Sequence, residues 1–219
     1  MLQRSEIQML ADKGLRFSDP FEIISLFEER VSAYMGAPYG VAVDCCTHAI
    51  ELCLRYLKAQ GPVAIPKNTY PSIPMTVLKL NAEISWTDEK WQRYYKLSPH
   101  PVLDASLCFE KISYVADSFM CLSFQQKKTL PIGRGGMILT SDKNAAAWFK
   151  KASYDGRSRH KKWKEDPIQM LGFHYYMTPE DAARGILLLE ELGANPVLTG
   201  GFSDYPDISQ LPVFKTHGH

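Results

Sequence analysis

Short apolar stretches alternate with amphipathic stretches along most of this chain, and this alternation restricts the possible folds more than any other feature. The apolar stretches suit strands, and they lie at residues 39–43, 63–66, 82–86, 101–104, 118–124 and 136–140. The amphipathic stretches have helical spacing, and they lie at residues 21–35, 48–59, 71–80, 142–152 and 178–192. Strands that alternate with helices predict an α/β fold, with three α/β/α layers and a mostly parallel central sheet. Residues 118–124 and 136–140 favour a hairpin or two adjacent strands.

The ends of several predicted helices carry capping residues. Ser18 or Asp19 can cap the helix at 21–35, and Gly36 suits its carboxyl end. Thr178 can cap the helix at 178–192, with Pro179 in its first position.

The charge and the cysteine count exclude several classes of protein. The 25 basic and 24 acidic residues give a net charge of +1, which provides no overall attraction for nucleic acid or an anionic membrane. No apolar run approaches the roughly 18 residues of a membrane span, and Met1–Glu6 lacks the apolar core of a signal peptide. The five cysteines match neither a disulfide framework nor a zinc site. We therefore expect a cytoplasmic protein without metal, nucleic-acid or membrane partners.

Ligands of parallel α/β sheets bind beyond the carboxyl ends of the strands. The residues that follow predicted strands are Asp44 to Thr47, Asn68 to Tyr70, Asp104, and Ser123 to Lys128. Taken alone, each of these segments allows two interpretations. Cys45-Cys46-Thr47 can bind a phosphate at a helix start or only cap that helix. Asp104 can pair with a cation or cap the next segment, and Tyr70 can stack on a ligand ring or lie in the core.

Taken in order, these motifs resemble those of the DegT/DnrJ/EryC1/StrS sugar aminotransferases. The most specific match is Leu-Ser-Phe-Gln-Gln-Lys-Lys-Thr-Leu at 122–130, followed by Gly-Arg-Gly-Gly at 133–136 and Thr-Ser-Asp at 140–142. The family has Phe-Ser-Phe, three residues, Lys, a short loop, Glu-Gly-Gly, a strand and Thr-x-Asp. Tyr-Asp-Gly-Arg at 154–157 is similar to the family's His-Gly-Arg turn. Residues 172–178 are similar to its Gly-Tyr-Asn-Tyr-Arg-Met-Thr segment, and the resemblance extends over about residues 20–192.

The resemblance implies a fold-type-I enzyme that uses pyridoxal 5'-phosphate (PLP). It assigns catalytic roles to Lys128 and Asp104. Lys128, rather than Lys127, has the family's spacing from Ser123, and would form the Schiff base with PLP. Asp104 would keep the pyridine nitrogen protonated, so that the ring can act as an electron sink. Tyr70 would stack on the ring.

The resemblance also implies a phosphate site and a dimer. Cys46, Thr47 and Ser123 match phosphate-binding positions, where N–H groups at a helix start act with hydroxyl groups. His174 matches an asparagine that reaches the phosphate from the neighbouring subunit, which implies a homodimer.

Several positions depart from the family pattern. Cys46 replaces a glycine, Leu107 replaces the glutamine that contacts the phenolic oxygen of the cofactor, and Arg134 replaces a glutamate. The chain is also much shorter than typical members. We expect a reduced PLP-binding large domain at 1–192 and a short C-terminal remnant, with a flexible tail, at 193–219.

The resemblance implies transfer of an amino group from an amino acid to a keto-sugar, through the Schiff base on Lys128. The acceptor is expected to be nucleotide-linked. The alternative is a catalytically impaired or repurposed relative that binds PLP or another anionic ligand. A dehydratase on the same scaffold agrees less well with the sequence. The dehydratase branch of the family has histidine in place of the lysine, whereas Lys128 is present here. An α/β binding protein without PLP also stays open. The basic run at 157–164 suits a solvated loop or a diphosphate contact.

Overall fold

The computed structural model describes residues 4–192 and 200–215. Its helices are α1 (Ser5–Asp12), α2 (Pro20–Met35), α3 (Cys46–Tyr56), α4 (Ser72–Lys79), α5 (Lys143–Ala152), α6 (Pro179–Glu191), α7 (Pro212–Lys215), and the short 3-10 helices η1 (Trp163–Glu165) and η2 (Phe202–Asp204). Its strands are β1 (Tyr39–Val43), β2 (Pro62–Pro66), β3 (Glu83–Thr87), β4 (Tyr95–Lys96), β5 (Val102–Asp104), β6 (Phe119–Ser123) and β7 (Gly136–Thr140). Every predicted strand and helix is present, whereas α1, β4 and the short helices were not predicted.

The strands form a five-stranded sheet in the order β1-β7-β6-β5-β4 and a separate parallel pair, β2-β3. Within the larger sheet, β5 and β6 are parallel. The pairs β1–β7, β6–β7 and β4–β5 are antiparallel. The predicted α/β class is confirmed. The larger sheet is mixed rather than mostly parallel, because β7 runs antiparallel to both of its neighbours and β4 runs antiparallel to β5. The expected adjacency of 118–124 and 136–140 is also confirmed.

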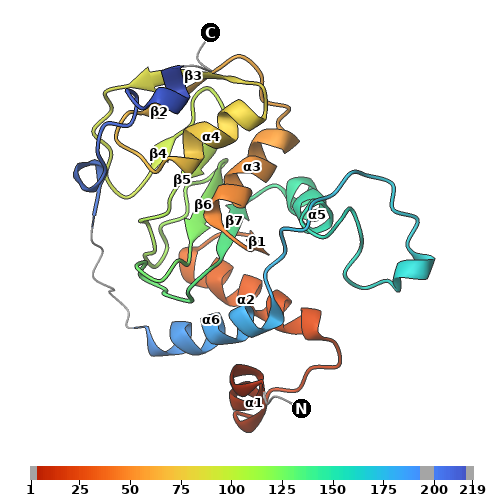
Figure 1. Cartoon of the computed structure of the whole chain (residues 1–219). Helices are drawn as coiled ribbons and strands as arrows, with labels where there is room; N and C mark the ends of the chain where they lie inside the picture. Colours follow the sequence, from red (N-terminus) through yellow and green to blue (C-terminus); the bar gives the residue numbers. More distant parts are fainter. Residues whose placement is uncertain (1–3, 193–199, 216–219) are drawn as a thin grey trace.

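Helices cover both faces of the larger sheet and complete the three predicted layers (Figure 1). The side chains of β1 alternate between the two faces of the sheet, and this shows how the layers are held together. Val41 and Val43 are buried in the core that contains α3 and α5, whereas Ala42 is buried in the core that contains α2 and α6. Because successive strand residues point to opposite faces, one short apolar strand contributes to both cores.

The predicted caps explain where two of these helices begin and end. The Asp19 carboxylate accepts a hydrogen bond from the Phe21 N–H at 2.8 Å, and α2 ends at Gly36, whose φ is +79°. The Thr178 hydroxyl accepts from the Asp181 N–H at 3.2 Å at the start of α6. These contacts satisfy backbone groups that a helix leaves unpaired at its ends.

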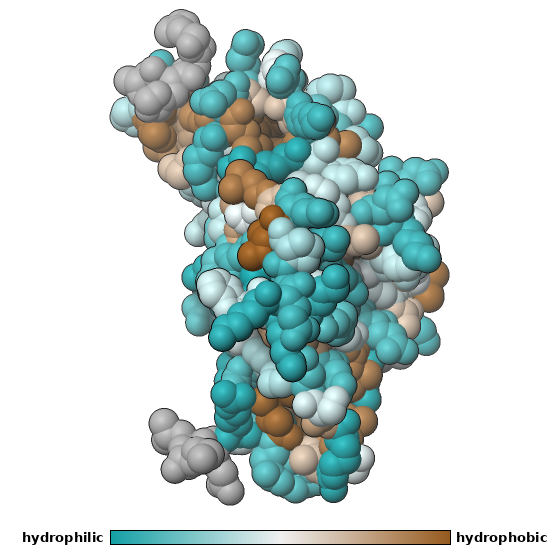
Figure 2. Space-filling model, turned by 90° about the vertical axis from the view of Figure 1, so that its right-hand side faces the viewer, coloured by the Kyte–Doolittle hydropathy of each residue, from teal (hydrophilic) through white to brown (hydrophobic). Residues whose placement is uncertain are grey.

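Hydrophilic side chains surround separate hydrophobic patches on the face shown in Figure 2. Among the described residues, no helix is both long and apolar enough to cross a membrane. Residues 200–215 lie beside β2 and β3, at the opposite end of the molecule from α6 (Figure 1). The predicted tail falls partly at 193–199 and 216–219, which lie outside the described residues.

Candidate active site

A cleft of about 630 Å³ opens where β1, β5 and β6 end and β7 begins. Its volume lies in the range of small-molecule sites. Six residues that the sequence singles out line this cleft: Cys46, Thr47, Tyr70, Asp104, Ser123 and Lys128. They come from separate parts of the chain and meet because the strand ends gather at one edge of the fold.

Asp104 is the buried acidic group of the cleft. It is the last residue of β5 and only 4% exposed. Its Oδ1 accepts a hydrogen bond from the Ser106 N–H at 3.1 Å, and its Oδ2 accepts one from the Tyr95 hydroxyl at 2.8 Å. The Cys46 thiol lies 4.0 Å from Oδ1. Both carboxylate oxygens are therefore held in place while the group still borders the cleft.

Lys128 is the partly buried amine of the cleft. Burial lowers its pKa, although the nearby Asp104 and Cys46 oppose this shift. A lowered pKa increases the fraction of neutral amine at neutral pH, and the neutral form is the nucleophile. The adjacent Lys127 also lines the cleft, so it is a natural control for the function of Lys128.

Hydroxyl groups gather at the amino-terminal ends of two helices. Thr47, in the first turn of α3, lies 2.8 Å from Ser72 at the start of α4, measured between the hydroxyl oxygens. Ser123, at the end of β6, lines the same cleft. A helix amino terminus with hydroxyl groups beside it favours an anion such as a phosphate. The sequence places Ser72 in the predicted helix at 71–80, but no motif assigns it a function.

The glycine pair that begins β7 lets that strand approach α3 closely. A Cβ atom on Gly136 would lie 2.5 Å from the Cys45 carbonyl carbon and 2.6 Å from the Cys46 nitrogen. Gly135 has a φ of +143° and forms an isolated bridge with Cys45. The pair thus keeps the start of α3 against the sheet.

We expect Gly136→Ala to lower the free energy of unfolding by about 3 kcal/mol, because backbone atoms must move to admit the methyl group. Gly133→Ala is the control. Gly133 has a φ of +119° but open space around it, so only backbone strain of about 1–2 kcal/mol should remain. Urea denaturation of both variants measures the difference, and equal losses would contradict the crowding argument.

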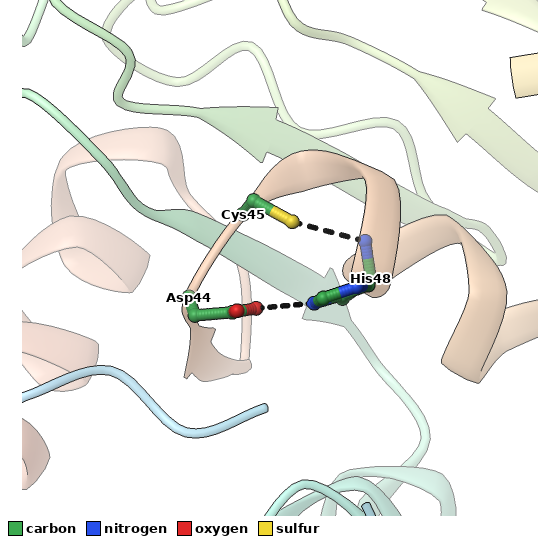
Figure 3. A group of neighbouring side chains, drawn as sticks. All are labelled: Asp44, Cys45 and His48. Carbon is green, nitrogen blue, oxygen red and sulfur yellow. Dashed lines mark hydrogen bonds and ion pairs between the residues drawn. The ribbon is translucent and has the colours of Figure 1, made fainter. Parts of the chain in front are cut away.

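Asp44, Cys45 and His48 form a cluster at the start of α3 (Figure 3). His48 Nδ1 lies 2.6 Å from Asp44 Oδ1, and Arg134 Nη2 lies 2.9 Å from Asp44 Oδ2. The His48 ring also stacks on Tyr175, with centroids 3.6 Å apart. Three such ligand atoms can hold a metal ion, but here two cationic groups already engage both oxygens of Asp44. These contacts of Asp44 with His48 and Arg134 form an ion-pair network.

The network predicts a pH-dependent stability. Burial alone would lower the pKa of His48, but hydrogen bonds with Asp44 and Cys45 outweigh it and raise the pKa to about 9. The ordinary value is about 6.5. The folded state therefore holds this proton more tightly, so the stabilisation is complete below pH 6.5 and is lost as the pH rises through 9.

We expect the wild type to lose about 2 kcal/mol of stability relative to His48→Gln between pH 6.5 and pH 9. The difference between the two proteins removes the contributions of other titrating groups. Loss of the stacking contact with Tyr175 should lower the stability of His48→Gln by the same amount at every pH. Denaturation curves across this range provide the measurement, and a constant difference would contradict a raised pKa for His48.

The three departures from the family pattern lie at or beside the cleft. The Cys46 side chain is buried, with its sulfur 3.6 Å from the Cys121 carbonyl oxygen. Leu107 gives the cleft an apolar wall. Arg134 lines the cleft while its guanidinium pairs with Asp44, so the reversed charge is partly neutralised.

The carboxyl-terminal segment supplies cleft residues that the sequence did not indicate. Asp204 and Tyr205 line the cleft. The Tyr205 carbonyl oxygen accepts from the Asn68 side chain at 2.8 Å, and its ring lies 5.6 Å from that of Trp91. Burial, followed by the nearby Asp104, raises the pKa of Tyr205 to about 12. No local motif marks this segment, because only its docking beside β2 brings it to the cleft.

His174 lies outside the cleft that the other predicted residues share. Its side chain is 71% exposed, and its Nδ1 lies 3.0 Å from Asp155 Oδ2. It belongs to the long connection between α5 and α6, part of which extends away from the sheet (Figure 1). Within one copy of the chain, His174 is therefore a surface residue.

Comparison with known proteins identifies the family of this chain. The model of the DegT/DnrJ/EryC1/StrS aminotransferase family matches residues 6–105 and 110–195. No curated protein matches the sequence at a significant level.

Solved structures share the fold. AtS13 from Actinomadura melliaura has a TM-score of 0.69 at 16% identity, over 86% of this chain and 64% of its own. The sugar aminotransferase CalS13 from Micromonospora echinospora has a TM-score of 0.67 at 15% identity, over 88% of this chain and 66% of its own. The PLP form of Spr1654 from Streptococcus pneumoniae has a TM-score of 0.63 at 15% identity, over 88% and 65%. The chain thus spans about two thirds of the length of these proteins.

Proposed function

Because the chain belongs to the DegT/DnrJ/EryC1/StrS aminotransferase family, we propose that it is a PLP-dependent aminotransferase with Lys128 as its covalent attachment residue. The proposed reaction moves an amino group from an amino acid to a nucleotide-linked keto-sugar. The observation that carries the proposal is the meeting of Lys128, Asp104 and a group of hydroxyls in one cleft.

The donor set of the cleft suits PLP, the cofactor on which this family depends. Thr47, Ser72 and Ser123 would hold its phosphate at the start of α3. Asp104 would hold its ring nitrogen. Tyr70, whose side chain is largely exposed beside the cleft, would cover the ring. When bound, PLP supplies an electron sink for the carbon that loses a proton.

The chain's own groups then have distinct tasks. Lys128 would hold the cofactor through its amine, whose lowered pKa makes the neutral, nucleophilic form available. Asp104 provides the fixed negative charge that favours a protonated ring nitrogen. Asp204 and Tyr205 form the wall contributed by the carboxyl-terminal segment. We propose that residues 1–192 are the reduced cofactor-binding domain and 193–219 its short remnant.

We also propose a homodimer in which His174 reaches the cleft of a second copy. His174 is exposed and does not line the cleft of its own chain, and both observations support this arrangement. Sedimentation in solution, combined with PLP titration of His174→Ala, tests it. A stable monomer that binds PLP as tightly as the dimer would contradict the proposal.

One observation favours a second candidate function, in which the protein binds PLP or another anion without efficient transamination. Leu107 stands where the family has a glutamine, and a leucine side chain cannot donate a hydrogen bond to the phenolic oxygen. The cofactor would then lack one contact that adjusts its electronic state.

A two-stage experiment separates these functions. PLP is added to the purified protein, its absorbance is followed, and the protein is reduced with borohydride before peptide mapping. Label on Lys128 supports PLP binding as proposed, whereas label spread over surface lysines contradicts it. The PLP-loaded protein is then mixed with single amino acids. A change in the absorbance of the bound cofactor with one of these amino acids supports an aminotransferase. Specific labelling of Lys128 without such a change favours the second candidate.

A further inference from the structure

We propose that Tyr95 is a positioning residue that fixes the Asp104 carboxylate for its contact with the cofactor, with Thr69 behind it. The inference rests on the proposed function, because the orientation of Asp104 toward a ring nitrogen matters only when PLP binds. It adds to the site a residue that lies behind the cleft and does not line it.

The strand β4 is what brings Tyr95 to Asp104. This strand has only two residues, and it pairs antiparallel to β5 with Tyr95 directly opposite Asp104. Directly opposed residues in an antiparallel pair present their side chains on the same face of the sheet. The Tyr95 hydroxyl therefore reaches Asp104 Oδ2 at 2.8 Å.

Proton counting fixes the direction of the hydrogen bonds. A carboxylate only accepts, and a tyrosine hydroxyl has one proton to donate. Since Tyr95 donates to Asp104, the Thr69 hydroxyl, whose oxygen lies 2.5 Å away, must donate to Tyr95. The result is a directed chain from Thr69 through Tyr95 to Asp104.

Burial makes this chain rigid. Tyr95 and Thr69 are each 1% exposed, and Asp104 is 4% exposed. Burial, followed by the charge of Asp104, raises the pKa of Tyr95 well above its ordinary value, which keeps its proton in place at any physiological pH. The Tyr95 ring also lies 5.0 Å from that of Trp91. Water cannot easily replace a buried donor of this kind.

A carboxylate held in this way differs from a free one in two respects. Its orientation is fixed before the cofactor arrives, so binding loses less conformational entropy. The hydrogen bond from Tyr95 also stabilises the negative charge that a protonated ring nitrogen would face. Tyr95 thus supports the positive ring nitrogen without touching it.

The test compares Tyr95→Phe with the wild type and with Tyr34→Phe. Tyr34 is a matched control because its hydroxyl is buried and has no hydrogen-bond partner among the residues that the structure describes. Each protein is titrated with PLP, the pH dependence of the bound cofactor's absorbance is recorded, and the lysine labelled by borohydride is mapped. Circular dichroism verifies that the variants are folded.

We expect Tyr95→Phe to keep the label on Lys128 but to bind PLP about 10- to 100-fold more weakly, as expected for a lost hydrogen bond to a charged group. The midpoint of its absorbance titration should also shift, and Thr69→Val should cause a smaller change in the same direction. Tyr34→Phe should match the wild type.

The outcomes distinguish the two levels of the argument. Wild-type protein without PLP on Lys128 would overturn both the proposed function and the role of Tyr95. If the wild type is labelled on Lys128 but Tyr95→Phe shows the same PLP affinity and the same absorbance titration as the wild type, only the role of Tyr95 is overturned. If Tyr95→Phe is unfolded, Thr69→Val decides, and an unchanged titration there would contradict the directed chain.

Discussion

Replacing Lys128 with alanine is expected to abolish covalent PLP attachment and to reduce transamination at least about 10³-fold, the scale seen when an essential nucleophile is removed. The Lys128 amine is partly buried in the cleft, and burial lowers its pKa. Mapping after borohydride reduction should find no label at position 128. Transamination is followed with the amino donor that the screen of the loaded protein identifies.

Lys127→Ala is the matched control for this experiment. Lys127 lines the same cleft and follows the same strand, so its removal changes the local charge equally. We expect Lys127→Ala to keep the label on Lys128 and most of the activity. Loss of the label in Lys127→Ala, with retention in Lys128→Ala, would assign the attachment to the neighbouring lysine and contradict the spacing argument from Ser123.

The cleft could be predicted where strand ends and local motifs coincide. The apolar run of β5 ends at Asp104, and the run of β6 ends at Ser123, so the position of both residues follows from the strands themselves. The helical periodicity predicts that α3 starts at residue 48, which is two residues too late, because cysteine and threonine carry little helical periodicity. The structure begins this helix at Cys46, which places Thr47 in its first turn.

The remaining site residues depend on contacts that no local pattern reveals. Tyr95 belongs to a strand of two residues, too short for an alternating pattern. Asp204 and Tyr205 enter the cleft through long-range contacts, such as the hydrogen bond of Asn68 to the Tyr205 carbonyl. The mixed character of the sheet has the same origin, because the direction of β7 follows from pairing and not from its composition.

Asp104→Asn is expected to reduce transamination about 10²- to 10³-fold, the cost of removing one preorganised electrostatic group, while Lys128 still accepts PLP. Asparagine has nearly the same shape, and its oxygen can still accept from the Ser106 N–H that now lies 3.1 Å from the carboxylate. What is lost is the negative charge that favours a protonated ring nitrogen. Single-turnover absorbance changes with an amino donor provide the measurement.

Asp204→Asn separates this charge effect from a general change in the cleft. Asp204 is a second carboxylate that lines the cleft, but it is exposed and lies on the carboxyl-terminal wall. Its removal changes the net charge equally, so a purely long-range effect would slow both variants alike. A much larger loss in Asp104→Asn would show that the position of the charge matters, because only Asp104 is buried and held by the Tyr95 hydroxyl. Equal rates in the two variants would contradict the assigned role of Asp104.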